Sequence, residues 1–487
     1  MHRRGFALAS CVAVLTAGAA AAAARTAADW PLPNLDVSST RALTSSRIDR
    51  ANVGRLRVAW RFRFRIKPGE AGVVTGAPVV SGGTVYVQDA KSNVYAIDLA
   101  TGRIRWRHGF GYTNSGPNGV ATAGGRVYGA TDAELFALSA ASGRLLWTQR
   151  LVTPTAPFVD VAPLVAGGTV YTSTVGVPPN GKGVLYAVDA ATGKVRWKLS
   201  TIKGEWRVPS EAGGGGAWYP PSTDGDTVFW GTANPNPYGG TRKHPNGGAY
   251  AGPALYTDAL LAVDAHTGAL SWHDQVTPHD VRDYDFQLPP ILVTIAGRPA
   301  VIGAGKAGVV IAWDRRTHRR IWQAKVGVRR NDSGPLPKHR VRVCPGLYGG
   351  VETPMAYAEG RVFVPVVDLC TRGSAYGYEP IENVDVSRGK GELVALDAAS
   401  GKRAWTRRLP QPDFGCATVA DGVVFTSTLG GTVYALDSRS GAILWKQKMR
   451  AGVNACPTVT SSSVLVASGV PVSRGSVLEL TALTVGG

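Results

Sequence analysis

The sequence predicts an all-β fold, an eight-bladed β-propeller. An eleven-residue pattern close to Ala-x-Asp-x-x-Thr/Ser-Gly-x-x-x-Trp recurs seven times, and each copy follows a short run of β-branched and aromatic residues. One tryptophan closes every copy. Because a single four-stranded blade cannot bury both of its faces, we expect each indole to dock between neighbouring sheets.

The copies occupy residues 96–106, 137–147, 187–197, 262–272, 312–322, 395–405 and 435–445, and residues 52–60 form a degenerate eighth copy. The run before a copy, such as residues 84–88, has the alternation of a strand. Within the copy, the aspartate can accept local backbone N–H bonds and the glycine tolerates positive φ. We therefore expect a tight turn at each copy, followed by an outward strand that carries the tryptophan.

The spacing of the tryptophans locates two long insertions. Most intervals are close to one blade, but Trp197 to Trp272 and Trp322 to Trp405 are much longer. We expect one propeller domain over residues 25–487, with insertions at about 198–260 and 323–390. Loops added to a rigid repeat scaffold commonly carry binding sites, so the chemistry is expected there.

The first residues resemble an export signal. His2, Arg3 and Arg4 precede a stretch of apolar and small residues that ends in alanines before Arg25. We expect residues 1–24 to be cleaved near residue 24, which predicts a secreted, periplasmic or cell-envelope protein. An uncleaved anchor and a lipoprotein signal cut at Cys11 are the alternatives, although the apolar core before Cys11 is short. No later segment has the apolar length of a transmembrane helix.

The net charge indicates which kinds of partner the protein could bind. Lysine and arginine exceed aspartate and glutamate, and the formal net charge is +19. Outside the cell, this charge favours anionic polymers, acidic small molecules or an acidic redox partner over nucleic acid, and a basic surface with no partner is the alternative.

Loss of Cys11 leaves four cysteines, which predicts two disulfides. The nearest pairs are Cys344–Cys370 and Cys416–Cys456, but four cysteines allow three connectivities.

Three motifs occur in an order that resembles the quinoprotein alcohol dehydrogenases of the methanol dehydrogenase type. They are the glycine run 213–216 before Trp218, Gly-Thr-Ala-Asn-Pro at 231–235, and Thr-Pro-His-Asp-Val-Arg-Asp-Tyr-Asp at 277–285. Segments 29–30 with 52–56, and 344–354, resemble an early and a late segment of that family. The resemblance covers most of the expected mature chain.

The resemblance implies that pyrroloquinoline quinone lies on the propeller axis together with a Ca²⁺ or lanthanide ion. Trp218 matches the floor under the quinone, and Asn234 matches the amide ligand of the metal. Asp283 matches the carboxylate that acts as ligand or catalytic base, and Asp285 matches the additional acid of lanthanide-using members. Lys306 matches the cationic residue beside the quinone oxygens.

The chemistry of these residue types agrees with the resemblance. A hard cation prefers oxygen ligands, and two aspartates two residues apart on an extended segment point the same way. The cation of Lys306 would stabilise negative charge on a reduced quinone. Residues 303–308 also fit Gly-x-Gly-x-x-Gly, but a strand-like run and a tryptophan repeat follow instead of a helix. This context excludes a dinucleotide site.

The chain departs from the family in several places. No acid stands near Pro178 and Pro179, where the family has a glutamate metal ligand, and residues 112–118 lack its adjacent cysteine pair. Arg282 replaces a tryptophan. Loss of the glutamate matters most, because a multivalent ion needs charge compensation.

Two further positions are candidates for contact with the quinone. Thr75 stands where the family has an acid, and Glu352 with Thr353 stand where it often has Asn-Trp. The dipeptide His279-Asp280 lacks a matching serine nucleophile motif, so we expect it to be structural rather than part of a hydrolase site.

These observations predict a PQQ-dependent dehydrogenase that oxidises a small or polymeric alcohol. Asp283 would accept the hydroxyl proton, hydride would pass to the quinone beside Lys306, and an external carrier such as a cytochrome c would accept the electrons. The alternative is a non-catalytic propeller that binds proteins in the cell envelope. Such a scaffold would explain the missing glutamate and cysteine pair.

Overall fold

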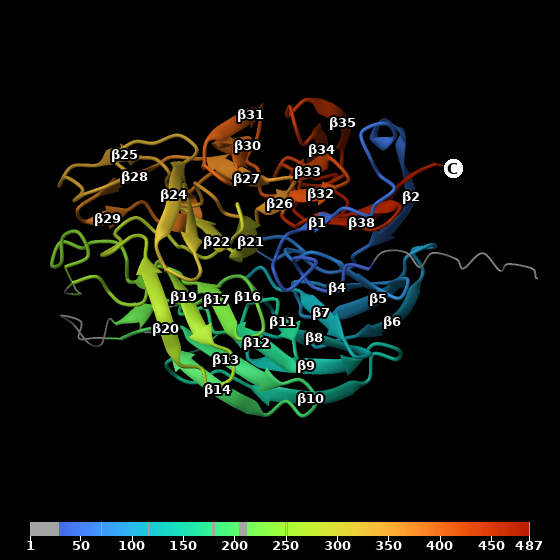
Figure 1. Ribbon diagram of the computed structural model, residues 1–487, viewed down its shortest axis with the longest axis horizontal. Coiled ribbons are helices and arrows are strands. Elements are labelled where there is room, and N and C mark those ends of the chain that lie inside the picture. The colour runs from blue at the N-terminus through green and yellow to red at the C-terminus, as the bar shows by residue number, and fades with distance from the viewer. Residues whose placement is uncertain are drawn as a thin grey trace, which may run out of the picture.

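The computed structural model describes residues 29–69, 71–114, 116–156, 158–177, 181–203, 212–248, 250 and 252–486. The expected export signal and Pro178 and Pro179 lie outside the described residues. The regular secondary structure of the described chain is almost entirely β-strand, and its strands form eight blade sheets arranged around a common centre (Figure 1). The prediction of an all-β, eight-bladed propeller is confirmed.

The first four blades follow one another along the chain. The first contains β3 (Val79–Ser81), β4 (Thr84–Gln88), β5 (Val94–Asp98) and β6 (Ile104–His108). The second contains β7 (Val120–Ala123), β8 (Arg126–Ala130), β9 (Glu134–Ser139) and β10 (Leu145–Arg150). The third contains β11 (Leu164–Ala166), β12 (Thr169–Ser173), β13 (Val184–Asp189) and β14 (Val195–Ser200). The fourth contains β16 (Ser222–Thr223), β17 (Thr227–Gly231), β19 (Ala259–Asp264) and β20 (Leu270–Gln275).

The other blades continue the ring. The fifth contains β21 (Ile291–Ile295), β22 (Arg298–Gly305), β23 (Val309–Asp314) and β24 (Arg320–Lys325). The sixth contains β26 (Ala356–Ala358), β27 (Arg361–Asp368), β30 (Lys390–Asp397) and β31 (Arg403–Leu409). The seventh contains β32 (Thr418–Ala420), β33 (Val423–Ser427), β34 (Thr432–Asp437) and β35 (Ile443–Lys448), with β1 (Ala42–Leu43) added in parallel. The eighth contains β36 (Thr458–Val459), β37 (Ser463–Ser468) and β38 (Glu479–Val485).

The ring is closed by strands from the two ends of the chain. Strand β2 (Leu56–Arg63), which follows the short 3-10 helix η1 (Val53–Arg55), pairs with β38 as the outermost strand of the eighth blade. Figure 1 shows these blue and red strands side by side. The degenerate copy that contains Trp60 therefore belongs to a blade assembled from both ends of the chain.

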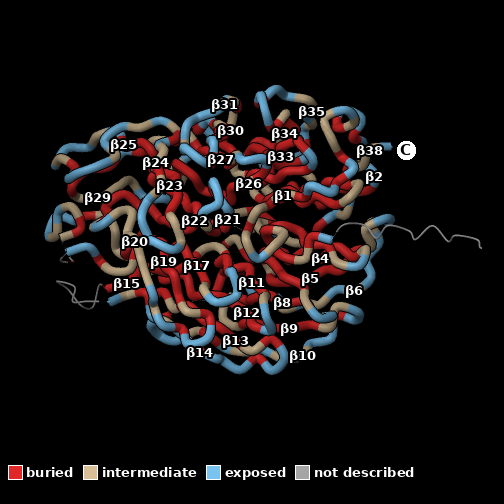
Figure 2. The backbone as a smooth tube through the Cα atoms, viewed as in Figure 1, coloured by how far each residue is buried: buried red, intermediate tan, exposed pale blue. Residues whose placement is uncertain are grey.

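Burial decreases from the centre of the ring to its periphery. Inner and middle strands such as β4 and β33 are buried along their whole length, whereas the outer strands β6, β10 and β35 expose at least half of their residues. Figure 2 shows the same gradient as a red interior and a pale blue edge. The apolar side chains of neighbouring blades pack between the sheets, which stabilises the ring through the hydrophobic effect.

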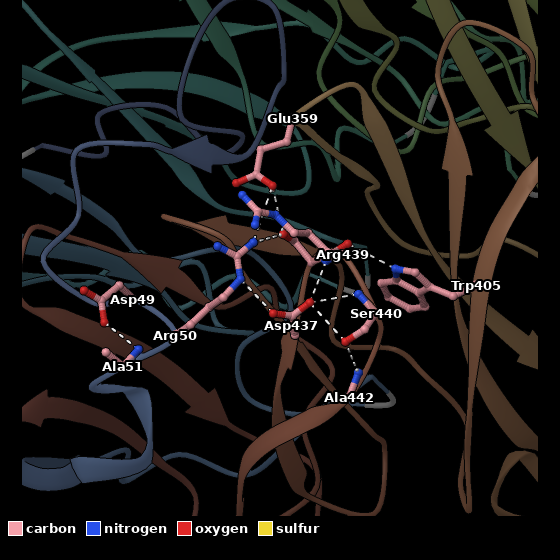
Figure 3. A network of polar contacts seen from close by, with 10 residues as sticks. Asp49, Arg50, Ala51, Glu359, Trp405, Asp437, Arg439, Ser440 and Ala442 are labelled. Atoms are coloured by element: carbon pink, nitrogen blue, oxygen red, sulfur yellow. Dashed lines mark hydrogen bonds and ion pairs between the residues drawn. The ribbon is translucent and has the colours of Figure 1, made fainter.

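The repeated turns form as the sequence predicts. A carboxylate oxygen of the turn aspartate accepts hydrogen bonds from the backbone N–H and the hydroxyl of the Thr or Ser three residues later, at Asp98, Asp189, Asp264, Asp397 and Asp437. The next glycine has positive φ, for example 68° at Gly441. Figure 3 shows this turn at Asp437 and Ser440, where Arg50 also binds Asp437 at 2.7 Å.

Seven of the eight docked tryptophans have a contact with the turn of the following blade among the described residues. The indole N–H of Trp405 donates to the Ser438 carbonyl oxygen at 3.0 Å, and a Cβ on Gly441 would lie 2.6 Å from the Trp405 ring. Equivalent indole hydrogen bonds occur at Trp60, Trp106, Trp147, Trp197 and Trp322. The glycine is therefore required by both its backbone conformation and the indole that covers it. In the fifth blade His318 replaces this glycine, and its ring stacks on Trp272 at 5.0 Å.

The segment before β2 links the inner strands at the hub. Its backbone bonds reach seven blades, through the pairs Trp30–Val80, Pro31–Thr122, Val37–Thr223, Ser38–Leu292, Thr40–Tyr357, Arg41–Val419 and Arg47–Ser461. The guanidinium of Arg41 is fully buried and donates to carbonyl oxygens of Pro33, Ala417 and Pro457. Burial lowers the pKa of Arg41 to about 9. This segment therefore fixes the blades to one another around the axis.

Smaller sheets arise within the two insertions. The first insertion contributes β15 (Gly213–Gly214) and β18 (Pro235–Asn236), which pair with each other. The second contributes β25 (Val341–Val343), β28 (Thr371–Ser374) and β29 (Gly377–Tyr378), with η3 (Ile381–Asn383) and η4 (Val386–Arg388).

Disulfides Cys344–Cys370 and Cys416–Cys456 are formed, so the nearest pairing is confirmed. Within the described residues, no helix has the length and apolar character needed to span a bilayer.

Candidate functional site

Three of the predicted residues form one buried ionic cluster. Asp283 and Asp285 lie in the segment that enters the fifth blade, and Lys306 lies in the turn between β22 and β23 of the same blade. The ammonium Nζ of Lys306 is 2.9 Å from Oδ2 of Asp283 and 2.7 Å from Oδ2 of Asp285. The three side chains are at most 10% exposed. The structure therefore brings an acid pair and a cation into direct contact.

Glycines let the backbone of Lys306 approach its neighbours. A Cβ on Gly305 would lie 2.0 Å from the Asp285 carbonyl oxygen, and a Cβ on Gly350 would lie 1.9 Å from the Lys306 carbonyl oxygen. Lys306 N–H also donates to the Asp285 carbonyl oxygen at 2.9 Å. The Gly-x-Gly-x-x-Gly pattern at 303–308 thus serves close packing of a strand turn, in agreement with the exclusion of a dinucleotide site.

Asn234 joins this cluster through its backbone. It follows β17, and its N–H donates to Oδ1 of Asp285 at 2.6 Å. The side-chain amide nitrogen donates to the Pro235 carbonyl oxygen at 2.9 Å. Both carboxylate oxygens of Asp285 are therefore engaged, one by Asn234 and the other by Lys306.

The segment that carries the acid pair is held from several sides. Asp280 accepts the N–H groups of Arg282 and Tyr284, and the ring nitrogens of His279 lie 2.9 and 3.1 Å from carbonyl oxygens of Asn246 and Gly252. His279 and Asp280 thus serve to position the backbone, as the sequence predicts. Asp283 itself has φ of 65°, an uncommon conformation for a residue other than glycine. The surrounding contacts must hold this strained backbone in place.

The second insertion packs against the acid segment. Arg282, which replaces the tryptophan of the resemblance, donates to carbonyl oxygens of Asn331, Ser333 and Gly334. The hydroxyl of Tyr284 donates to the Pro345 carbonyl oxygen at 3.0 Å, next to the Cys344–Cys370 disulfide. The long loop is therefore anchored directly on the segment that presents Asp283 and Asp285.

Glu352 and Thr353 lie beside the cluster, in the segment that enters the sixth blade. Both are buried, and Oε1 of Glu352 and Oγ1 of Thr353 have no hydrogen-bond partner among the described residues. Oε2 of Glu352 accepts from Gln287 at 3.4 Å, and the Tyr219 hydroxyl donates to the Glu352 carbonyl oxygen. Unsatisfied buried polar atoms of this kind are costly unless a ligand or water binds them.

Burial dominates the electrostatics of the site. It raises the pKa of Asp283 well above the usual value, although the nearby Lys306 cation acts in the opposite direction. Burial lowers the pKa of Lys306, but the charges of Asp283 and Asp285 outweigh it and leave that pKa well above the usual value. Burial also raises the pKa of Glu352 to about 7. The site therefore contains acids that hold their protons more tightly than free carboxyl groups.

The structure does not bring every predicted residue into this cluster. The hydroxyl of Thr75 donates to the Gly116 carbonyl oxygen and lies 3.1 Å from the Asn118 side chain. Trp218 is half-buried and immediately precedes Tyr219, whose hydroxyl donates to the Glu352 carbonyl oxygen. These two residues stay predictions of the resemblance.

Two site residues were missed by sequence reasoning. Burial raises the pKa of the Tyr238 phenol, and the charge of Asp283 adds to this increase. Asp258 is fully buried, neither of its carboxylate oxygens has a partner among the described residues, and burial with the charge of Asp280 raises its pKa. A signal for Tyr238 was its place four residues after Asn234. Asp258 lies beside a strand and gave no signal.

A metal ion at this cluster would need several oxygen ligands that are free to bind it. Within the described part of the chain, no group of three or more His, Cys, Asp or Glu side chains is placed so that it could hold an ion. Asp283 and Asp285 are already bound to Lys306, and Asn234 adds one amide oxygen. Calcium takes six to eight oxygen ligands. The residues in this arrangement do not fit a Ca²⁺ or lanthanide site.

Comparisons with known proteins agree with this architecture. The family model of the glucose/ethanol/alcohol dehydrogenase β-propeller domain matches residues 30–328. The model of the outer membrane protein assembly factor BamB matches residues 389–485. The chain is 29% identical to a quinohemoprotein alcohol dehydrogenase of Comamonas testosteroni, over 90% of this chain and 71% of that protein. It is 26% identical to a lanthanide-dependent methanol dehydrogenase of Methylacidiphilum fumariolicum, over 82% of this chain and 77% of that protein.

Solved structures give the same result. The crystal structure of the Comamonas testosteroni quinohemoprotein alcohol dehydrogenase superposes with a TM-score of 0.80 and 25% identity, over 94% of this chain and 81% of that chain. BamB from Moraxella catarrhalis superposes with a TM-score of 0.56 and 14% identity, over 88% of this chain and 97% of that chain, which reflects the shared fold alone. Because its family model covers more than half of the sequence, the chain belongs to the PQQ-dependent glucose/ethanol/alcohol dehydrogenase family.

Proposed function

We propose that this chain is an exported quinoprotein alcohol dehydrogenase that uses pyrroloquinoline quinone and passes electrons to a separate carrier. The observation that supports this most is the buried contact between Lys306 and the Asp283–Asp285 pair at the hub. A scaffold has no need for two carboxylates and an ammonium in so little solvent, since burying charges costs free energy.

The unsatisfied polar atoms support a quinone ligand. Pyrroloquinoline quinone carries carboxylates and carbonyl oxygens, which require hydrogen-bond donors and positive charge. Lys306 supplies the charge, and Thr353 has a buried hydroxyl with no partner among the described residues. A protonated Glu352 would be a further donor. Thr75 and Trp218 would complete the contacts if the resemblance holds for them. The residues at the site thus fit such a cofactor.

The chain's own residues would perform the proton chemistry. When bound, the quinone would supply the two-electron acceptor for hydride from the alcohol carbon. Asp283 would accept the hydroxyl proton of the alcohol, and its raised pKa makes its carboxylate a stronger base than a free one. Lys306 would hold the charge of Asp283 in place and stabilise negative charge on the acceptor. Tyr238, whose phenol interacts electrostatically with Asp283, would orient the alcohol.

The metal of the resemblance would bind Asn234, Asp283 and Asp285. A relative that is a lanthanide-dependent methanol dehydrogenase makes Ca²⁺ or a lanthanide the ions to consider. Since the donor set does not fit such an ion as it stands, no step of the proposed reaction is assigned to a metal.

The net charge supports the proposed electron acceptor, and the disulfides support the proposed compartment. The net charge of +19 would attract an acidic external carrier such as a cytochrome c. Two disulfides are typical of an oxidising compartment outside the cytoplasm, in agreement with an export signal over residues 1–24. The substrate class is an alcohol, small or polymeric.

The proposal is tested by reconstitution. Purified mature protein is incubated with pyrroloquinoline quinone, alone and with Ca²⁺ or a lanthanide, and alcohol-dependent reduction of an artificial dye is followed. We expect turnover with at least one alcohol, and none after the quinone is omitted. Absence of both quinone binding and turnover under every condition would overturn the proposal.

A scaffold role is the second candidate, because the last blades match the BamB model. A protein that only binds other proteins would fold normally and bind no quinone. The reconstitution experiment therefore separates the two functions directly.

A further inference from the structure

We propose that the ammonium group of Lys306 takes the place of the metal cation, so that this chain binds its quinone without a metal ion. The inference rests on the proposed quinone function. It concerns the class of cation at the site, and it follows from three features of the described residues.

The first feature is the occupancy of the carboxylate oxygens. A metal ion held by Asp283 and Asp285 would need carboxylate oxygens that are free to bind it. One oxygen of each carboxylate binds Lys306, at 2.9 and 2.7 Å. The remaining oxygen of Asp285 accepts the Asn234 N–H at 2.6 Å. Asp285 therefore has no oxygen left that is free of a donor.

The second feature is the charge balance. Asp283 and Asp285 are nearly solvent-free, so water screens their charges weakly and a cation must be close. Lys306 supplies one positive charge to both. A divalent or trivalent ion in contact with the same oxygens would lie next to this ammonium and be repelled by it. The acid that would offset such an ion is missing from the sequence near Pro178 and Pro179.

The third feature is the rigidity of the lysine backbone. Gly305 packs against the backbone of Asp285, Gly350 packs against the backbone of Lys306, and the Lys306 N–H donates to the Asp285 carbonyl oxygen. Replacing either glycine would create contacts of 2.0 Å or less with backbone oxygens. The β22–β23 turn therefore fixes the backbone position from which the Lys306 side chain reaches the two carboxylates.

The chemistry of an ammonium group suits this role. It has three N–H donors, of which Asp283 and Asp285 occupy two. The third can donate to an oxygen of the quinone and favour the reduced, more negative form. Lys306 would thus supply both the compensating charge and the polarising contact that a bound ion would otherwise supply.

The test is quinone binding under metal control. Protein purified in buffer containing a chelator is analysed for metals and then titrated with pyrroloquinoline quinone, with tryptophan fluorescence as the readout. We expect one quinone per chain, less than 0.1 equivalent of metal, and a Kd that changes less than twofold when Ca²⁺ or a lanthanide is added.

Variants sharpen the same titration. Lys306→Met should weaken metal-free quinone binding at least 100-fold, whereas Lys194→Met, on an exposed turn, should leave it unchanged. Wild-type protein that binds quinone at least tenfold more tightly with a metal would overturn this inference and leave the proposed function standing. Failure to bind quinone with or without metals would instead overturn the proposed function. The titration of wild-type protein with and without metal decides the inference by itself, even if Lys306→Met does not fold.

Discussion

The aspartates at the edge of the ring and those at the hub differ in burial, in their partners and in the direction in which their pKa is shifted. At the edge, Asp98 is held by Thr101 and paired with Arg105 in solvent, and these hydrogen bonds lower its pKa to about 2. At the hub, burial raises the pKa of Asp283 and of Asp258 well above the usual value. The same side chain thus stabilises a turn in one region and is kept reactive in the other.

The two regions differ in how far apart in the sequence the partners of each aspartate lie. An edge aspartate is satisfied by residues within seven positions of it in the chain, such as Thr101 and Arg105. A hub carboxylate depends on residues far apart, since Asp285 meets Asn234 from another blade and Lys306 from a later turn. Local chemistry stabilises the edge, and convergence of distant segments creates the site.

The largest expected contrast is in catalysis. Asp283→Asn should reduce kcat/KM for alcohol-dependent dye reduction about 10²- to 10⁴-fold, because it removes the group that accepts the proton. Asp98→Asn, its counterpart at the edge, should leave kcat/KM unchanged. Steady-state kinetics of both reconstituted variants measure the contrast. Equal activity of Asp283→Asn and wild type would show that this carboxylate is not the base.

The second contrast is between two ion pairs. Lys306→Ala should lower the free energy of unfolding by about 3–5 kcal/mol, because it leaves two buried carboxylates uncompensated. Arg105→Ala should cost no more than about 1 kcal/mol, because its pair with Asp98 is exposed. Urea unfolding followed by fluorescence gives both values. Similar losses in the two variants would contradict the difference in environment.

The third prediction uses pH. The pKa of Glu352 is raised to about 7 by burial, so the folded state binds its proton more tightly than the unfolded chain does. Its contribution to stability is complete below about pH 4.5 and is lost as pH rises through 7, a change of roughly 3 kcal/mol. Glu352→Gln should remove this part of the pH dependence. The matched variant of the exposed Glu382 should retain it, and identical profiles for both variants would refute the assignment.

The smallest expected effect lies in a single edge turn. Thr101→Val removes the hydroxyl that donates to Asp98 and should lower the free energy of unfolding by about 1 kcal/mol, without an effect on quinone binding. Thermal unfolding and the fluorescence titration measure the two quantities. A loss of quinone binding in this variant would show that the edge and the hub are coupled.

The repeat made the fold predictable. Each Asp, Thr or Ser, Gly and Trp acts within its own turn or on the next turn in the chain, so the pattern alone indicates eight blades and their tight turns. The exception at His318 is local too, because its ring stacks on Trp272 in place of the usual glycine contact. The disulfides join the cysteines that are nearest in sequence, although the sequence alone left three connectivities open.

The site could be predicted only in part. The resemblance placed Asn234, Asp283 and Lys306 in one region, and the structure brings them together. Their arrangement could not be read from the sequence, because the contact of Lys306 with both carboxylates depends on the packing of Gly305 and Gly350. The unsatisfied oxygen of Glu352 likewise results from tertiary burial.

The most direct measurement is a crystal structure of the protein soaked with pyrroloquinoline quinone. The account predicts the quinone at the hub, with one of its oxygens within hydrogen-bond distance of the Lys306 ammonium and with Asp283 beside the reacting carbon. Density for the quinone at the edge of the ring, or a hub that stays empty at saturating quinone, would contradict it.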